Sequence, residues 1–126
     1  MSESIEFVSI KSHRDDRGEL VSFESGAPLT FEPKRVFSIR NVPPGQYRAR
    51  HAVSCDEFLI LQSGTCRLTI KSLTKQISYD LSDLDTGIFV PAGYWIELSD
   101  FSTNALILVL CSQRYEDVEY YNEPQL

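Results

Sequence analysis

The sequence contains no hydrophobic run that approaches the roughly 20 residues needed to cross a membrane. Its three cysteines, Cys55, Cys66 and Cys111, form no Cys-x-x-Cys pair. An odd cysteine count without that spacing indicates free thiols in a reducing compartment. The N-terminal stretch MSESIEFVSI has an early acidic residue and no apolar core, so we expect no signal peptide, no membrane association and a cytoplasmic protein.

Basic residues are fewer than acidic ones. The chain has 12 lysines and arginines against 18 acidic residues, which gives a net charge of −6 at pH 7. This balance argues against a general binder of nucleic acid or of anionic membranes. It still allows a local cluster of arginines around a phosphorylated ligand.

Helical periodicity is missing, because no segment repeats apolar residues at i, i+3, i+4 and i+7 beyond a turn or two. Short alternating runs recur instead, bounded by Gly, Pro, Asp and Ser clusters. We therefore predict an all-β sandwich or barrel that forms one domain over residues 1–126. The predicted strands are Glu6–Ile10, Leu20–Phe23, Arg35–Arg40, Tyr47–Ala52, Glu57–Ser63, Thr65–Ser72, Lys75–Leu81, Thr86–Val90, Trp95–Leu98 and Ala105–Ser112. Within the last run, Ala105–Leu110 is apolar on both faces, so it predicts a central core strand.

Two spacings give this prediction a more specific form. Residues 45–64 have the frame of the first cupin signature, and residues 91–96 have the frame of the second. The two frames, in this order, resemble cupins and imply a cupin-type double-stranded β-helix (jelly-roll) barrel. The slots of the first frame hold Gly45, His51, Val53, Glu57 and Gly64, and those of the second hold Pro91, Gly93 and Ile96.

The occupants of these slots bear on metal binding. In metal-binding cupins the histidine and glutamate slots supply the metal ligands, but here Val53 and Ile96 cannot ligate a metal. His51 and Glu57 remain, which is fewer than the three or more N, O or S ligands of a stable divalent site. We expect no metal and no other cofactor.

Further residues resemble the sugar-nucleotide 3,4-ketoisomerases, the WxcM-like family of cupins. Residues 16–20 (DRGEL) resemble the DxRGxL element of that family, residues 34–36 (KRV) its KRVY segment, and residues 48–53 (RARHAV) its RGxHAH segment. Residues 63–67 resemble an NGS-type turn, and the longest match covers residues 87–112. Three residues depart from the family pattern: Phe37 replaces a tyrosine, and Val53 and Ile96 each replace a histidine.

The resemblance implies an activity and an assembly. Members of the family move the carbonyl of dTDP-4-keto-6-deoxyglucose from C4 to C3, without a metal, in deoxysugar biosynthesis for surface polysaccharides or antibiotics. They are usually homodimers that exchange N-terminal strands. The implied partners of this chain are therefore a dTDP-linked keto sugar and a second copy of itself.

Isomerisation through an enediol needs a base that takes the proton from C3 and a group that returns one at C4. His51 is the candidate base, because imidazole titrates near neutral pH. An alignment with the gap placed earlier would put Arg50 in its slot. Tyr47 and Tyr94 are the candidate proton donors.

The candidate binding residues surround this base. Arg40, Arg48 and Arg50 suit a diphosphate, since guanidinium groups bind phosphate oxygens in pairs, and Trp95 suits stacking on thymine. We expect Arg48, Arg50 and His51 to face one side of their strand, and Glu57 to pair with the arginines. Purely structural roles for His51 and Trp95 stay open.

Three functions stay open at this stage. The first is an active ketoisomerase, or a relative with shifted chemistry such as 3,5-epimerisation. The second is a non-catalytic module that binds the nucleotide sugar as a partner or regulator of another enzyme. The third is an unrelated small-molecule-binding cupin.

Overall fold

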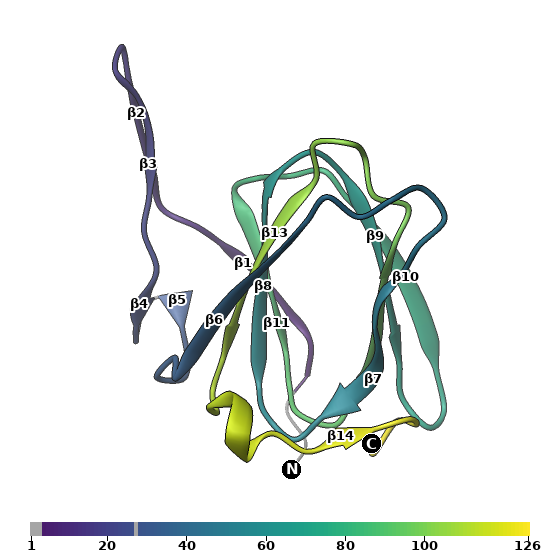
Figure 1. Cartoon of the computed structure of the whole chain (residues 1–126). Helices are drawn as coiled ribbons and strands as arrows, with labels where there is room; N and C mark the ends of the chain where they lie inside the picture. The colour runs from purple at the N-terminus through teal and green to yellow at the C-terminus, as the bar shows by residue number, and fades with distance from the viewer. Residues whose placement is uncertain (1–3, 27) are drawn as a thin grey trace.

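A computed structural model describes residues 4–26 and 28–126. Two five-stranded antiparallel sheets face each other and form a barrel (Figure 1). The first sheet contains, in spatial order, β1 (Glu6–Ser9), β11 (Thr86–Val90), β8 (Glu57–Ser63), β13 (Leu106–Cys111) and β6 (Arg35–Arg40). The second contains β10 (Gln76–Leu81), β9 (Cys66–Lys71), β12 (Trp95–Ser99), β7 (Arg48–Val53) and β14 (Tyr120–Tyr121). The protein is thus a cupin-type jelly-roll barrel, as predicted.

Two apolar layers hold the barrel together, one inside it and one outside the first sheet. β8 contributes to both, since Phe58, Leu59, Ile60 and Leu61 are all buried, and their side chains alternate between the layers. The inner layer joins the two sheets, and the aliphatic residues of both sheets form it: Ile39, Leu59, Leu61, Leu68, Ile70, Ile88, Ile96, Leu98, Ile107 and Val109. The outer layer is Ile10, Leu29, Phe58, Ile60, Phe89 and Leu110.

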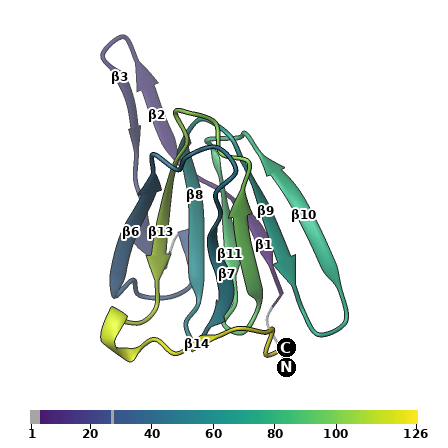
Figure 2. The ribbon, with the colours of Figure 1, turned by 45° about the vertical axis from the view of Figure 1, so that its right-hand side comes forward.

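The N-terminal segment covers this outer layer and then leaves the barrel. Ile10 and Leu29 are buried against the first sheet. Between them β2 (Ser12–Asp15) and β3 (Gly18–Val21) form an antiparallel hairpin that extends beyond the barrel in both views (Figures 1 and 2). A short parallel pair, β4 (Glu24–Ser25) and β5 (Pro28–Leu29), follows the hairpin.

The bounds of three predicted strands agree with the structure. The predicted bounds Arg35–Arg40, Glu57–Ser63 and Thr86–Val90 coincide with β6, β8 and β11. The central position of Ala105–Leu110 is confirmed, because β13 pairs with β6 on one side and with β8 on the other. The short strands β2, β4, β5 and β14 were not predicted.

Helix is confined, in the part of the chain that is described, to the single 3-10 turn η1 (Tyr115–Asp117). No helix among these residues is long and apolar enough to span a membrane.

Candidate functional site

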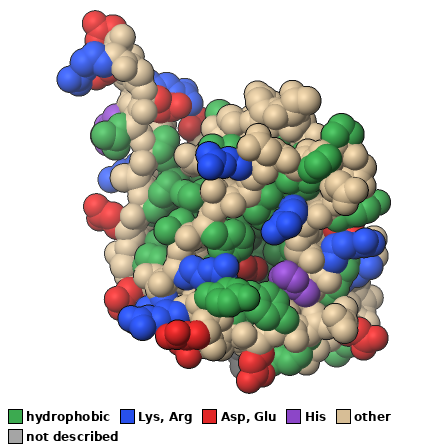
Figure 3. All heavy atoms as spheres, in the orientation of Figure 1, with side chains coloured by type: hydrophobic (Ala, Val, Ile, Leu, Met, Phe, Trp, Pro, Cys, Tyr) green, Lys and Arg blue, Asp and Glu red, His purple; other side chains and the backbone are tan. Residues whose placement is uncertain are grey.

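A cavity of about 400 Å³ lies between the two sheets. Side chains of β6, β7, β8, β12 and β13 line it, together with Tyr115 of η1 and Tyr120 of β14. The face of the molecule turned to the viewer in Figure 3 carries basic side chains, in blue and purple, among hydrophobic ones. The cavity falls within the usual size range of small-molecule sites.

A β-bulge in β7 determines which side chains reach the cavity. Ile96 pairs with His51, but the next residue, Glu97, pairs with Ala49, so Arg50 has no partner on β12. Ala49 and Arg50 both have positive φ, 66° and 67°. The extra residue shifts the alternation of the strand.

The bulge brings Arg48 and His51 to the same cavity. Arg50 instead points away from it: its Nε lies 3.0 Å from Glu97 Oε2, and its guanidinium lies 4.3 Å from the centre of the Tyr47 ring. The expectation that Arg50 shares a face with Arg48 and His51 is therefore wrong, because the bulge separates them. His51, rather than Arg50, is the residue that lines the cavity.

His51 is partly buried, and its ring meets the ring of Tyr120 edge to face with the centres 4.9 Å apart. Burial, and then the positive charge of Arg48, lower the pKa of His51 from its usual 6.5. The imidazole is therefore mostly neutral at neutral pH and can accept a proton.

Glu57 lies in the same cavity and is almost fully buried, with 7% of its surface exposed. Burial raises the pKa of its carboxyl group to about 7, although a hydrogen bond from the Cys111 thiol and the charge of Arg35 act in the opposite direction. No ion pair joins Glu57 to an arginine within the described residues. The predicted pairing with Arg48 and Arg50 is thus wrong: Arg50 pairs with Glu97, and the arginine whose charge lowers the pKa of Glu57 is Arg35.

Arg35 was missed as a site residue. Its guanidinium lies 4.7 Å from the ring centre of Phe37 and 4.8 Å from that of Tyr115, and all three residues line the cavity. These two cation–π contacts help to hold the guanidinium in place. Arg35 belongs to the KRV segment, residues 34–36, which the sequence analysis used only as evidence of family resemblance.

Two other candidates lie beside the cavity. Arg40 and Tyr47 line a shallow neighbouring hollow between β6 and β7, and Arg48 lines both this hollow and the cavity. Arg48 therefore connects the two spaces.

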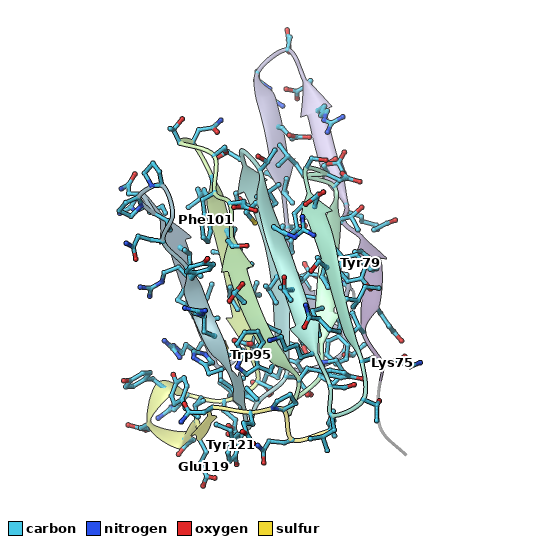
Figure 4. All side chains as sticks on the ribbon, turned by 90° about the vertical axis from the view of Figure 1, so that its right-hand side faces the viewer. Lys75, Tyr79, Trp95, Phe101, Glu119 and Tyr121 are labelled. Carbon is cyan, nitrogen blue, oxygen red and sulfur yellow. The ribbon has the colours of Figure 1, made fainter. Side chains whose placement is uncertain are left out.

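The aromatic pair Tyr94 and Trp95 does not line the cavity. On β12 the side chains of Ile96 and Leu98 face inward, so Trp95 faces outward, where Lys71 Nζ lies 4.3 Å from its ring centre (Figure 4). The structure therefore does not bring Trp95 or Tyr94 to the cavity that holds His51. Tyr115 and Tyr120 supply the cavity tyrosines instead.

The cupin metal slots face the cavity but do not fit a metal. Val53 and Ile96 line it with aliphatic carbon next to His51 and Glu57. Two of the four slots therefore offer no donor atom. Phe37, the third departure from the family pattern, lines the same cavity.

Comparisons with known proteins agree with this architecture. The family model described as "FdtA: WxcM-like, C-terminal" matches residues 3–126. A curated TDP-4-oxo-6-deoxy-alpha-D-glucose-3,4-oxoisomerase from Aneurinibacillus thermoaerophilus is 28% identical over 119 residues, which is 92% of this chain and 84% of the relative.

Solved structures give the same result. The WlaRB TDP-quinovose 3,4-ketoisomerase from Campylobacter jejuni is 28% identical with a TM-score of 0.89, covering 97% of this chain and 95% of the other. A 3,4-ketoisomerase from Helicobacter canadensis is also 28% identical, with a TM-score of 0.88 and coverage of 97% and 92%. The chain belongs to the WxcM-like ketoisomerase family of the cupin superfamily, as its sequence motifs predicted.

Proposed function

We propose that this protein is a 3,4-ketoisomerase of deoxysugar biosynthesis that acts on TDP-4-keto-6-deoxyglucose in the cytoplasm. Its curated and solved relatives carry this reaction class in their names. The observation that carries the proposal is the position of His51, a partly buried imidazole of lowered pKa in a cavity that also holds Arg48. That environment provides a neutral base beside a cation that can bind an anionic ligand.

The two connected spaces suggest how the substrate lies. The keto sugar occupies the cavity, and the diphosphate lies where Arg48 bridges the cavity and the shallow hollow. Arg40, in that hollow, is the second cation for the diphosphate. The thymidine then extends along the hollow towards Tyr47, and Trp95 takes no part.

In the chemical step His51 takes the proton from C3 of the sugar. The C–H electron pair forms a C3–C4 double bond, and the C4 carbonyl oxygen gains negative charge and then a proton, which gives an enediol. Return of a proton to C4 and loss of the C3 hydroxyl proton complete the shift of the carbonyl to C3. No oxidant or reductant is needed.

The cavity offers groups for the remaining roles. The guanidiniums of Arg35 and Arg48 can stabilise the oxyanion as it develops, since fixed charges act strongly in a partly buried site. Tyr120, which packs on His51, replaces Tyr47 and Tyr94 as the candidate donor to C4. Glu57, whose pKa burial raises to about 7, lies in the same cavity and is protonated in part at neutral pH.

A second candidate function is favoured by the apolar wall of the cavity. Phe37, Val53 and Ile96 stand where the family resemblance expects a tyrosine and two histidines, and all three line the cavity. A protein that bound the nucleotide sugar without converting it would tolerate these losses. It would act as a partner or regulator of another enzyme.

We also propose a homodimer with exchanged N-terminal strands. The β2–β3 hairpin extends beyond its own barrel, and 61% of the surface of its Leu20 is exposed. β6 lies at the edge of the first sheet, and 58% of the surface of its Val36 is exposed. Uncovered sheet edges and apolar side chains of this kind are usually covered by a partner.

One assay separates these functions. The protein is incubated with TDP-4-keto-6-deoxyglucose and followed by NMR, while calorimetry measures the binding of TDP. Binding with conversion to a 3-keto sugar supports the isomerase. Binding without conversion supports the non-catalytic module, and no binding contradicts both.

A further inference from the structure

Three buried donor groups converge in the wall of the cavity, and the proposed isomerisation does not need two of them. They are the thiols of Cys55 and Cys111 and the carboxylate of Glu57. Their donor atoms all lie within 4.8 Å of one another, and Cys111 Sγ is 3.8 Å from Glu57 Oε2. The residues expose only 3%, 1% and 7% of their surface.

The fold fixes this convergence. Cys111 and Glu57 are directly paired across β13 and β8, and Cys55 lies in the loop that leads from β7 into β8. All three side chains face the cavity, so an ion can reach them from solvent without opening the core. The cluster is therefore both preformed and accessible.

The charge of Glu57 is compensated only in part by its surroundings, through the positive charge of Arg35. A buried carboxylate is costly unless a positive charge or several hydrogen bonds compensate it. Glu57 has no basic group within ion-pair distance in the described part of the chain, and its hydrogen-bond contact is the weak thiol donor of Cys111. A metal ion bound by the ionised carboxylate would add to the partial compensation that Arg35 provides without an ion pair.

The donor types define the class of metal. Two sulfur atoms and one carboxylate oxygen suit a thiophilic ion with tetrahedral geometry, whereas Mg²⁺ and Ca²⁺ require oxygen ligands. Two sulfurs on one zinc ion, each about 2.3 Å from the metal, lie about 3.8 Å apart in tetrahedral geometry. The present separations exceed this by at most about 1 Å, which side-chain rotation can close.

We propose that Cys55, Glu57 and Cys111 form a binding site for a thiophilic divalent cation such as Zn²⁺, with the fourth coordination position open to the cavity. On binding, the two thiols and any protonated carboxyl group release their protons to solvent, and the metal forms two S–Zn bonds and one O–Zn bond. The expectation of no metal considered only the cupin slots, and this set shares Glu57 alone with them. The proposal does not depend on the isomerase activity.

Cobalt titration tests the site, because a thiolate bound to Co²⁺ gives intense charge-transfer absorption in the near ultraviolet. Tag-free protein, reduced and freed of metal with chelator, is titrated with Co²⁺ and then with Zn²⁺. We expect the absorption to saturate at one equivalent and Zn²⁺ to displace Co²⁺, since Zn²⁺ binds such sites more tightly.

Serine variants identify the ligands. Cys55→Ser and Cys111→Ser should each weaken Co²⁺ binding at least about tenfold and reduce the charge-transfer intensity, because each removes one sulfur ligand. Cys66→Ser is the matched control: Cys66 is as deeply buried, at 4%, but lies in β9 outside the cluster, so it should bind like the wild type. Circular dichroism checks that each variant is folded.

A second measurement needs no variant. X-ray absorption at the zinc edge of the wild-type protein should show two sulfur neighbours at about 2.3 Å and lighter N or O neighbours. A folded wild type without cobalt–thiolate absorption overturns the proposal, as does a zinc shell of N and O atoms only. Absorption lost in Cys66→Ser but kept in Cys55→Ser and Cys111→Ser also overturns it.

Discussion

Arg48 and His51 lie three residues apart on β7, yet both line the same cavity. A regular strand would send them to opposite faces, because its side chains alternate. The bulge at Ala49 and Arg50 removes this conflict by inserting one unpaired residue. The proposed base and the proposed diphosphate ligand are thus brought together by a local backbone irregularity.

The bulge allows two neighbouring arginines to serve as test and control. Arg48→Ala should weaken TDP binding about 10- to 100-fold, the scale of one or two lost charged hydrogen bonds. Arg50→Ala removes the same charge from the outer face, where Arg50 pairs with Glu97. It should change TDP binding less than about twofold, because exposed ion pairs of this kind contribute little. Calorimetry measures both. Equal losses in the two variants would mean that net charge, rather than the position of Arg48, governs binding.

The strain at the bulge gives a second prediction. Ala49 has a φ of 66°, in the left-handed region that costs a residue with a side chain about 1–2 kcal/mol. Ala49→Gly should remove this cost. Glycine also gives the unfolded chain more conformational freedom, which destabilises the folded state by about 0.5–1 kcal/mol. The net result should be a stabilisation of about 0.5–1 kcal/mol.

Ala52→Gly is the control in the same strand, because Ala52 is fully buried and has no positive φ. It should destabilise the protein by at least about 0.5–1 kcal/mol. Urea unfolding measures the free energy of both variants. A destabilised Ala49→Gly variant would contradict the assignment of strain to this position.

The lowered pKa of His51 predicts the pH dependence of turnover. A base must be unprotonated, so kcat/KM should fall on the acid side as His51 gains a proton. Since burial and Arg48 lower the pKa of His51 below 6.5, the acid limb should lie below pH 6.5. Arg48→Ala removes the repulsion between the guanidinium and the imidazolium, so it should move this limb to higher pH. An acid limb well above pH 7 would exclude His51 as the group that titrates.

The barrel and the position of His51 could be predicted from the sequence, because each rests on local information. Short apolar runs such as Glu57–Ser63, bounded by turn residues, indicate strands, and the cupin frame places His51 and Glu57 on cavity-facing strands. The outward orientation of Trp95 could also have been predicted from this frame. Its neighbour Ile96 occupies a slot that faces the cavity, and side chains alternate along a strand, so Trp95 faces outward.

Other features carry no local signal. The bulge uses Ala49 and Arg50 at positive φ, where glycine would have indicated it. The contacts of Arg35 with Tyr115, and of His51 with Tyr120, join strands of the barrel to the C-terminal segment, whose path depends on tertiary packing. The cysteine–carboxylate cluster likewise joins Cys55 and Glu57 to Cys111, which comes much later in the sequence.

The dimer can be tested on one exposed leucine. Leu20 lies on the hairpin that would reach the partner, so Leu20→Lys should weaken the dimer at least about tenfold by placing a charge in an apolar contact. Leu73→Lys is the control, since Leu73 is also exposed, at 71%, but lies between β9 and β10. Sedimentation equilibrium of wild type and variants measures the change. A wild-type monomer at micromolar concentration would exclude the dimer, and an equal effect of both variants would exclude the hairpin as its contact.

His51→Asn tests the base directly. The amide keeps a similar shape and polarity but cannot accept the C3 proton, so turnover should fall about 10²-fold or more. TDP binding should change little, because the diphosphate is assigned to Arg40 and Arg48. A variant that kept wild-type turnover would remove His51 from the mechanism.

The most direct measurement is NMR of TDP-4-keto-6-deoxyglucose incubated with the wild-type protein in deuterated water. If His51 shuttles protons through an enediol, the carbonyl moves to C3 and the product carries deuterium at C4, and both signals are lost with His51→Asn. If the wild type binds the nucleotide sugar but forms no 3-keto product and incorporates no deuterium over hours, the isomerase assignment is wrong.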